Sequence, residues 1–180
     1  MEGGSDRMRW MSVNNAMTKD VICVKVSGNV KDAWLALMEA DISGAPVLDD
    51  SGALVGILSM TDIFREIMER FDKARSLRQA TSSSDDSSAM DKDEVRVLSL
   101  VIRAISESTV GSILPKDQNV IALSPEDSLE RALHLIAEHN INRLPVVHGN
   151  HVVGIVTRQD IIWLVAGRPG QSQEGGQPAH

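Results

Sequence analysis

A seven-residue phrase occurs twice in this chain, and the repetition limits the folds that the chain can adopt. The first copy, GILSMTD, occupies residues 56–62, and the second copy, GIVTRQD, occupies residues 154–160. Each copy closes a longer matching segment, residues 20–62 or 119–160, and both segments keep the same order of apolar runs around one proline. Because self-similarity of this kind is the signature of a repeated structural unit, we expect two copies of one unit.

Both copies predict the same order of elements. A short apolar run predicts a strand, a stripe of apolar residues predicts a helix, two more strands enclose a turn, and a second helix follows the phrase. The unit is therefore β-α-β-β-α, and at about 55 residues it buries too little surface to be stable alone. The expected strands are Val21–Val24, Ala45–Leu48 and Leu54–Leu58 in the first copy and Val120–Leu123, Leu144–Val147 and Val152–Val156 in the second.

The apolar stripes place the expected helices. The segment Ser124–Asp127 offers a capping serine, an early proline and two acids, so it predicts the start of a helix. Trp34 and Met38 fall on the first stripe, so we expect both in the core. The stripes are Val30, Ala33, Trp34, Leu37 and Met38, then Ile63, Phe64, Ile67, Met68 and Phe71, then Leu129, Ala132, Leu133, Ile136 and Ala137, then Ile161, Ile162, Leu164 and Val165.

Composition narrows the function classes. The chain of 180 residues is 42% hydrophobic, which is enough for a core, and its net charge of −7 disfavours a nucleic-acid-binding surface. The single cysteine, Cys23, excludes an intramolecular disulfide and lies in an apolar run, so we expect a core residue rather than a reactive thiol. No apolar run has the length of a membrane span, and the N-terminus lacks a signal peptide's apolar core, so we expect a cytoplasmic location.

Two interpretations of the repeated phrase are open. Ser59 and Thr157 lie where a strand ends and a helix begins, and an acid follows each three residues later, Asp62 or Asp160, as in a capping box. The same arrangement can hold a ribonucleotide, because a helix N-terminus attracts a phosphate. A carboxylate one turn later can also accept hydrogen bonds from the two hydroxyls of a ribose. A single phrase favours the cap, and only the duplication taken together with a family resemblance favours the nucleotide.

The chain resembles a tandem pair of CBS domains, also called a Bateman module. The resemblance rests on the two G-φ-φ-[ST]-x-x-D phrases (φ, apolar), on the segments ISGAPV and INRLPV, and on the triplet AMT before the first expected strand. It covers roughly residues 12–70 and 108–167. It implies a mixed α/β fold of two β-α-β-β-α CBS repeats packed with pseudo-twofold symmetry, and it implies that the module often forms homodimers.

The resemblance also divides the chain. Residues 81–94, TSSSDDSSAMDKDE, are polar and serine-rich and predict a mobile linker, and residues 95–106 predict a helix. The expected division is a flexible N-terminus (1–11), CBS repeat 1 (12–72), a connection (73–107), CBS repeat 2 (108–167) and a flexible C-terminus (168–180).

The function that the resemblance implies is regulatory. Such pairs bind AMP, ADP or ATP, and sometimes S-adenosylmethionine or a dinucleotide such as NAD, in clefts between the repeats, and they respond by changing conformation or partner contacts. Ser59 or Thr157 would lie near the phosphate, Asp62 or Asp160 would bind the ribose, and Arg143 would bind phosphate through its planar guanidinium. The adenine slot would join the first strand to the residues before the proline. The implied ligand-binding residues are Thr18, Val21, Ile22, Ile42, Ser43, Gly44, Pro46, Ser59, Asp62, Val120, Ile121, Ile141, Asn142, Arg143, Pro145, Thr157, Arg158 and Asp160.

The two copies differ at positions that matter for a ligand. The second copy has Arg143 where the first has Gly44, and it has Pro115 where the first has Thr18. Pro115 lacks the threonine hydroxyl, and Gly44 lacks the cation. We therefore expect one good site and one that is poor or empty.

Other chemistry has little support in the sequence. His134 and His139 are too far apart in sequence to share a helix face, and His148 and His151 flank a turn, so we expect no metal site. No nucleophile motif, glycine-rich phosphate loop or paired carboxylates point to catalysis, so we expect no catalytic residues. The alternatives to a nucleotide sensor are a module for S-adenosylmethionine or NAD and a ligand-free protein that acts through interaction or dimerisation. A regulated enzyme or transporter is the expected partner.

Overall fold

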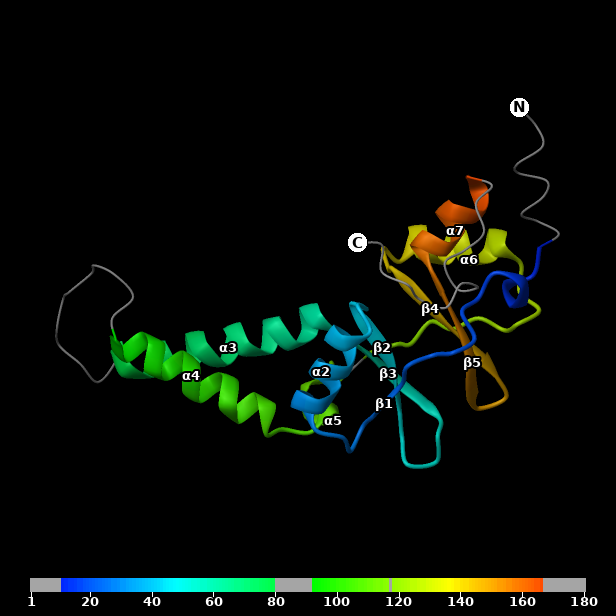
Figure 1. Cartoon of the computed structure of the whole chain (residues 1–180). Coiled ribbons are helices and arrows are strands. Elements are labelled where there is room, and N and C mark those ends of the chain that lie inside the picture. Colours follow the sequence, from blue (N-terminus) through cyan, green and yellow to red (C-terminus); the bar gives the residue numbers. More distant parts are fainter. Residues whose placement is uncertain (1–10, 80–91, 117, 167–180) are drawn as a thin grey trace, which may run out of the picture. The chain divides into compact units, whose positions relative to one another are not determined.

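The computed structural model describes residues 11–79, 92–116 and 118–166, and it confirms the mixed α/β fold (Figure 1). Contacts between residues divide the chain into two compact units. We call residues 23–50 and 55–118 the first-repeat unit, and the rest, which includes 51–54 and 119–166, the second-repeat unit. Of the two ends that we predict to be flexible, only Met11 lies within the described residues.

The first-repeat unit contains a three-stranded sheet in the order β1-β2-β3. Its strands are β1 (Val24–Lys25), β2 (Gly44–Leu48) and β3 (Leu54–Ser59), and β1 runs parallel to β2. Helix α2 (Val30–Glu39) begins at Asn29, whose side chain accepts a hydrogen bond from the backbone N–H of Lys31 at 2.8 Å. The helix buries Val30, Ala33 and Leu37 in the core.

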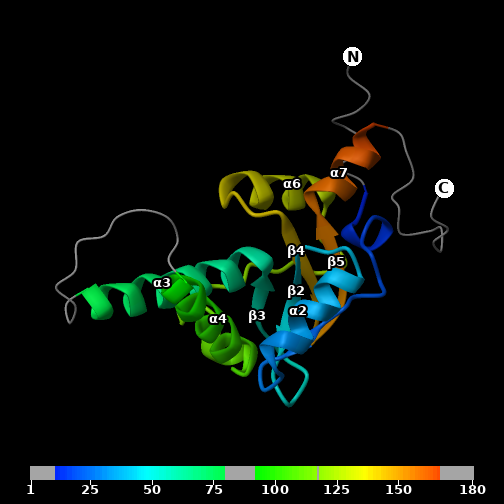
Figure 2. The ribbon, with the colours of Figure 1, turned by 60° about the vertical axis from the view of Figure 1, so that its left-hand side comes forward.

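A long helical hairpin completes this unit. Helices α3 (Met60–Gln79) and α4 (Lys92–Ser106) lie side by side (Figures 1 and 2), and the short helix α5 (Val110–Ile113) follows. An ion pair of 3.2 Å between Arg75 and Glu94 joins the two long helices. The helix that we predict over residues 95–106 is confirmed. It begins at Lys92, so residues 92–94 are not part of a mobile linker, and residues 80–91 lie outside the described part.

The second-repeat unit is built around a hairpin of two antiparallel strands. Strands β4 (Arg143–His148) and β5 (His151–Thr157) pair with a bulge between Val146 and Val147 (Figure 1). Helices α6 (Leu129–Glu138) and α7 (Arg158–Val165) pack with them. The core buries Leu129, Ala132, Ile136, Leu144, Val146, Val156 and Ile161.

The segments that lead into the two repeats are exchanged between the units. The 3-10 helix η1 (Val13–Asn15) precedes the first repeat in sequence, but Val13 is fully buried in the core of the second-repeat unit. Conversely, α5 precedes the second repeat, and its Val110 and Ile113 are buried in the core of the first-repeat unit. The backbone N–H of Gly111 donates to the carbonyl of Val26 at 2.8 Å, which fixes α5 beside β1. Each unit therefore needs residues that lie far apart in sequence.

Three local predictions are wrong. The predicted strand Val21–Val24 begins only at Val24, where β1 starts, and in the second copy only Leu123 pairs, through one parallel bridge to Val146. The helix expected from Ser124 begins at Leu129 instead, with Ser128 as its cap. Residues 124–127 form a turn, because the carboxylate of Asp127 accepts a hydrogen bond from the backbone N–H of Ser124 at 2.8 Å.

The apolar stripe of α2 is narrower than predicted. Met38 is 62% exposed, and Trp34 is half-buried, with its ring edge-on to Phe64 at a centroid distance of 5.8 Å. The counterpart residues of α6, Leu133 and Ala137, are also exposed. A helix buries only the stripe that faces its neighbour, so the residues beside Val30, Ala33 and Leu37 remain at the edge of the core.

Candidate functional site

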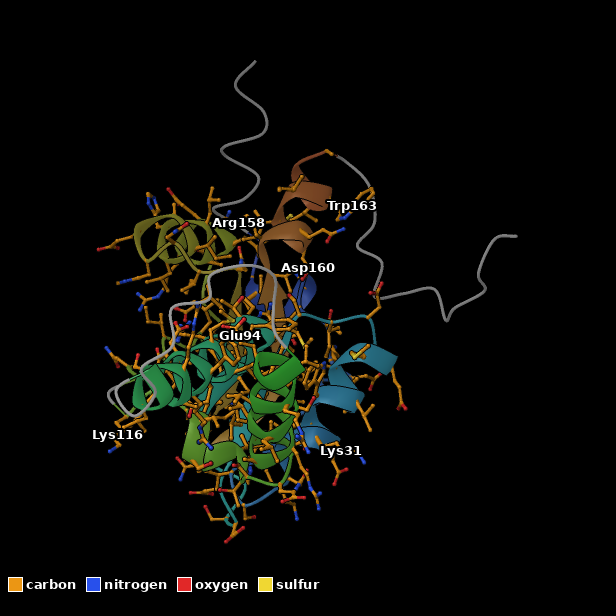
Figure 3. All side chains as sticks on the ribbon, turned by 90° about the vertical axis from the view of Figure 1, so that its left-hand side faces the viewer. Lys31, Glu94, Lys116, Arg158, Asp160 and Trp163 are labelled. Atoms are coloured by element: carbon orange, nitrogen blue, oxygen red, sulfur yellow. The ribbon has the colours of Figure 1, made fainter. Side chains whose placement is uncertain are left out.

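The repeated phrase forms the junction between a strand and a helix in both units. In the first-repeat unit β3 ends at Ser59 and α3 begins at Met60, and in the second-repeat unit β5 ends at Thr157 and α7 begins at Arg158. Asp160 lies in the first turn of α7 (Figure 3). The position expected for the two phrases is therefore confirmed.

The first junction is held by reciprocal hydrogen bonds. The Asp62 carboxylate accepts hydrogen bonds from the backbone N–H of Ser59 at 3.0 Å and from the Ser59 hydroxyl at 2.5 Å. The backbone N–H of Asp62 donates to that hydroxyl at 3.2 Å. One carboxylate oxygen, Oδ2, accepts both bonds, so the capping box leaves Oδ1 for another partner.

The second junction repeats this geometry closely. Asp160 Oδ2 accepts hydrogen bonds from the backbone N–H of Thr157 at 2.8 Å and from its hydroxyl at 2.7 Å. The backbone N–H of Asp160 donates to the hydroxyl at 3.2 Å. The capping interpretation of the phrase is thus confirmed in both units, and whether the same groups also bind a nucleotide is a separate question.

The remaining carboxylate oxygens differ between the junctions. Asp62 Oδ1 pairs with the guanidinium of Arg65 at 2.9 Å, and the side chain of Asp62 is only 12% exposed. Trp163 holds the equivalent place in α7 (Figure 3), and within the described part of the chain Asp160 has no ion pair. The second junction therefore keeps a carboxylate oxygen that no described cation neutralises.

Each helix start is tied to the segment before the proline. The backbone N–H of Met60 donates to the carbonyl of Ser43 at 3.0 Å, and that of Arg158 donates to the carbonyl of Asn142 at 2.9 Å. The Arg158 guanidinium also folds back onto the carbonyl of Ile141 at 3.3 Å. These bonds place Ser43 beside the start of α3, and they place Asn142 and Ile141 beside the start of α7. Pro145 lies opposite Ile155 in the β4–β5 ladder, two residues before Thr157.

The helix N-termini offer fewer open donors than a bare helix end. The first N–H group of each helix bonds a carbonyl, and the third bonds the capping hydroxyl. Among the described residues, the second N–H group, of Thr61 or of Gln159, has neither a backbone nor a side-chain acceptor. A phosphate at either junction would therefore need a cation to supplement that one donor.

Arg143 can supply that cation in the second-repeat unit. Its backbone lies opposite Thr157 in the β4–β5 ladder, and its side chain is half-buried. The buried glycine Gly44 occupies the matching place at the start of β2. The pairing of an arginine with the capping threonine thus occurs at only one of the two junctions.

The lead-in residues Thr18, Val21 and Ile22 lie in the second-repeat unit, whereas Ile42, Ser43 and Gly44 lie in the first-repeat unit. That these six residues form one adenine slot stays a prediction. Thr18 forms a backbone bridge with Ile155 of β5, with both N–H to O distances at 2.9 Å. Val120 and Ile121 lie in the same unit and are half-buried. The exchange of lead-in segments was not predicted, since a repeat pattern does not reveal which copy a lead-in segment joins.

Gln118 is a site residue that the sequence patterns do not reveal. Its side-chain oxygen accepts a hydrogen bond from the backbone N–H of Ile57 at 2.8 Å, and its side-chain nitrogen donates to the Ile57 carbonyl at 3.0 Å. Ile57 lies two residues before Ser59. The replacement of threonine by Pro115 is the signal that could have found this pair, because a proline cannot donate the backbone bond that Thr18 makes.

Other candidate sites remain weak. The described residues hold no cluster of three or more His, Cys, Asp or Glu side chains that could bind a metal ion. Cys23 is a half-buried free thiol, and burial raises its pKa, which opposes formation of the reactive thiolate. In the described part of the chain, no helix combines the length and the apolar character needed to cross a membrane.

Comparison with known proteins identifies both repeats. The model of the CBS domain matches residues 13–69 and 110–167, more than half of the chain. An uncharacterised protein of Methanocaldococcus jannaschii is 31% identical over 84% of this chain and 89% of its own length. The chloroplastic CBS domain-containing protein CBSX2 of Arabidopsis thaliana is 30% identical over 77% of this chain, but the match spans only 56% of that protein.

Solved structures show the same fold. The CBS domain of a CBS domain-containing membrane protein from Sphaerobacter thermophilus gives a TM-score of 0.66 at 25% identity and covers 89% of this chain and 91% of its own. A structure of CBSX2 in complex with AMP gives a TM-score of 0.60 at 25% identity and covers 87% of this chain and 96% of its own.

Proposed function

Because this chain belongs to the CBS domain family, we propose that it is a regulatory module that binds an adenine nucleotide, AMP, ADP or ATP, and responds by changing conformation or partner contacts. The observation that carries the proposal is the second junction, where Asp160 bonds Thr157 and Arg143 lies opposite Thr157 in the β4–β5 ladder. The complex of CBSX2 with AMP supports the choice of ligand. The family resemblance suggests a cleft between the repeats as the binding place.

The groups of the second junction suit the parts of a nucleotide. Asp160 keeps Oδ1 for the ribose hydroxyls while Oδ2 maintains the cap. The Arg143 guanidinium and the open N–H of Gln159 suit a phosphate, because charge-assisted hydrogen bonds to a planar guanidinium are among the strongest in proteins. Thr18, Val21, Ile22, Val120 and Ile121 are proposed to contribute the adenine slot. We assign the stronger site to this junction.

The first junction is the weaker candidate. It has Gly44 in place of Arg143, and Arg65 already occupies the second oxygen of Asp62. A ribose would have to displace this ion pair before it could bind Asp62. The sequence predicts unequal ligand binding by the two copies, and Arg65 is a second reason for this inequality.

The experiment that tests the proposal compares ligands by thermal shift. A ligand that binds only the folded state at 100 times its Kd adds about 2.7 kcal/mol, which raises Tm by roughly 5–10 °C at about 2–4 °C per kcal/mol. We expect such a rise with at least one of AMP, ADP and ATP, and a smaller rise with adenosine. A larger rise with S-adenosylmethionine or NAD would favour the alternative ligands, and no rise with any of them would favour a ligand-free interaction protein.

Matched variants assign the roles. Arg143→Met should reduce the shift with AMP and leave the shift with adenosine unchanged, because adenosine has no phosphate. Asp160→Asn should reduce both shifts, because both ligands carry the ribose. If Asp160→Asn lowers the unliganded Tm but leaves both ligand shifts intact, Asp160 is a cap only and the ribose assignment is wrong.

We also propose that the module forms a homodimer through the first-repeat unit. Met38 of α2 and Phe64 and Met68 of α3 are 62%, 51% and 53% exposed, and Trp34 joins the two helices by its contact with Phe64. Exposed apolar clusters of this kind often mark protein–protein contacts. The substitution Met68→Glu should shift the mass in analytical ultracentrifugation from dimer to monomer, whereas the matched Ile162→Glu on α7 should not. A wild-type protein that is monomeric at all concentrations would refute this proposal.

The regulatory role requires a target that responds to the bound state. An enzyme or a transporter is the kind of partner that such a module controls, and we propose no catalytic step for this chain itself. A bound ligand can shift an equilibrium between two conformations only by its difference in affinity for them. A change of hydrogen exchange away from the ligand residues on addition of AMP would therefore be the first sign of the response.

A further inference from the structure

The edges of strands β3 and β5 are closed in different ways at equivalent positions. In the second-repeat unit the backbone of Thr18 bridges to Ile155, two residues before Thr157. In the first-repeat unit the matching edge position is Ile57, two residues before Ser59, and its partner is the side chain of Gln118. A side-chain amide carries one donor and one acceptor, so it can reproduce both bonds of a backbone bridge.

Pro115 explains why a side chain makes this bridge. It aligns with Thr18, and it has no N–H group to donate to the Ile57 carbonyl. Gly56 lets Gln118 come close, since a Cβ at this position would meet the Gln118 side-chain oxygen at 2.9 Å and Leu114 Cδ1 at 3.0 Å. The glycine of the repeated phrase and the glutamine after the proline therefore form one arrangement.

We propose that Gln118 is a positioning residue that couples the Ser59–Asp62 junction to the proposed adenine-slot residues Val120 and Ile121. On one side its amide fixes β3 at Ile57, and so fixes the junction of Ser59 and Asp62 that follows. On the other side the chain continues within three residues to Val120 and Ile121, which are assigned to the adenine slot. A ligand that displaces Val120 also displaces Gln118, and the two bonds from Gln118 to Ile57 then shift the start of α3. This inference rests on the proposed nucleotide function.

The proposed coupling depends on a side chain in the first-repeat unit only. The bridge at Ile155 uses backbone groups of Thr18, so only a substitution by proline, which removes the N–H, would break one of its bonds. The bridge at Ile57 depends on one side chain, and its removal leaves a half-buried N–H and carbonyl without their partners, which is the costly way to lose a hydrogen bond. The first-repeat unit is therefore the half in which the strand edge can open.

The test combines amide exchange with ligand titration on the full chain. Gln118→Ala removes both bonds, and Gln118→Glu keeps the size of the side chain but replaces the donor by a carboxylate oxygen that faces the Ile57 carbonyl. Lys116→Ala is the matched control, because Lys116 lies exposed in the same connection (Figure 3). Hydrogen exchange at the Ile57 amide, followed by NMR, reports the bridge, and the Ile155 amide serves as an internal reference.

We expect both Gln118 variants to accelerate exchange at Ile57 on the order of tenfold and to weaken AMP binding about fivefold, as the loss of a bonded pair predicts. Exchange at Ile155 and the Lys116→Ala variant should match the wild type. Unchanged protection of Ile57 would overturn the bridge. Faster exchange with unchanged AMP affinity would reduce Gln118 to a structural residue and overturn the coupling. A wild-type protein that binds none of AMP, ADP and ATP refutes the proposed function, whereas wild-type binding that is unaffected by Gln118→Ala refutes the coupling alone, so the two failures are distinct.

Discussion

The two strand-to-helix junctions share a cap but differ in almost everything around it. Ser59 with Asp62 and Thr157 with Asp160 make the same three hydrogen bonds at nearly the same distances. The cation beside the acid is Arg65 in one case, whereas the other has Arg143 across the ladder. The difference teaches that the phrase sets the local backbone, while residues outside the phrase decide what the junction can bind.

The largest expected effect tests how closely the lead-in segments approach the phrases. A Cβ at Gly154 would meet Met17 at its Sδ, at Cγ (2.8 Å) and at Cβ (3.1 Å), and Met17 is buried. We expect Gly154→Ala to lower the free energy of unfolding by about 2–3 kcal/mol, as overpacking of a core does. Gly56→Ala should cost less, because its Cβ would meet only the ends of the Gln118 and Leu114 side chains, although displacement of Gln118 weakens its bonds to Ile57. Urea denaturation of the two variants measures the difference, and equal losses would contradict it.

The second prediction concerns the cap that both junctions share. Thr157→Ala and Ser59→Ala each remove the hydroxyl that accepts from the third helical N–H, so each should cost about 1 kcal/mol of stability. Because the geometry is the same, the two losses should agree within a few tenths of a kcal/mol. A Thr157→Ser variant keeps the hydroxyl and serves as the control. A loss at only one junction would break the equivalence of the two caps.

The third prediction uses the matched left-handed residues after α2 and α6. Asp41 has a φ of 51° and Asn140 a φ of 49°, and glycine adopts this region without strain. Asp41→Gly should raise the free energy of unfolding by about 0.5 kcal/mol, because the relief of strain exceeds the added freedom of the unfolded chain. Asn140→Gly should gain less, since asparagine tolerates the left-handed region well. Thermal unfolding without ligand gives the comparison, and a loss of stability at either position would contradict it.

The smallest expected change in stability tests the asymmetry of the acids. Arg65 is 51% exposed, so Arg65→Ala should change the free energy of unfolding by less than about 0.5 kcal/mol. It should nevertheless increase the AMP response of the first junction, because Asp62 Oδ1 becomes available. Isothermal titration of Arg65→Ala in the Arg143→Met background isolates this junction. An unchanged response would remove Arg65 as a cause of the asymmetry.

The sequence predicts the repeated unit well because the repeated residues determine local structure, through apolar spacing and helix caps. The helices over α2, α4 and α6, the paired strands and both junctions follow from apolar spacing and capping residues. The width of the α2 stripe was not predictable, since Met38 shows its exposure only once the neighbours of the helix are known. The cap of α6 at Ser128 could have been predicted from the repeat, because Asn29 caps α2 at the equivalent place.

The candidate site was predictable only in part. The phrases, Arg143 and the segments before the prolines lie at the junctions as expected. The grouping of Thr18 with the second repeat and the contact of Gln118 with Ile57 depend on long-range pairing, which a pattern of local residues does not encode. Pro115 indicates the contact of Gln118 with Ile57 indirectly. Because proline has no N–H group, another group must bond the strand edge at this place.

The exchanged lead-in segments govern the order in which the protein can be completed on the ribosome. The first-repeat unit lacks Val110 and Ile113 until the chain has grown to α5, and Gln118 is the last residue that it needs. Val13 and Met17 emerge before the first repeat, yet they wait for Leu129 and Val156 before they are buried. The first-repeat unit can therefore be completed once Gln118 has been translated, whereas the second-repeat unit waits for the second repeat. A nascent chain that stalls between the repeats exposes Val13 and Met17, whose core partners are still missing.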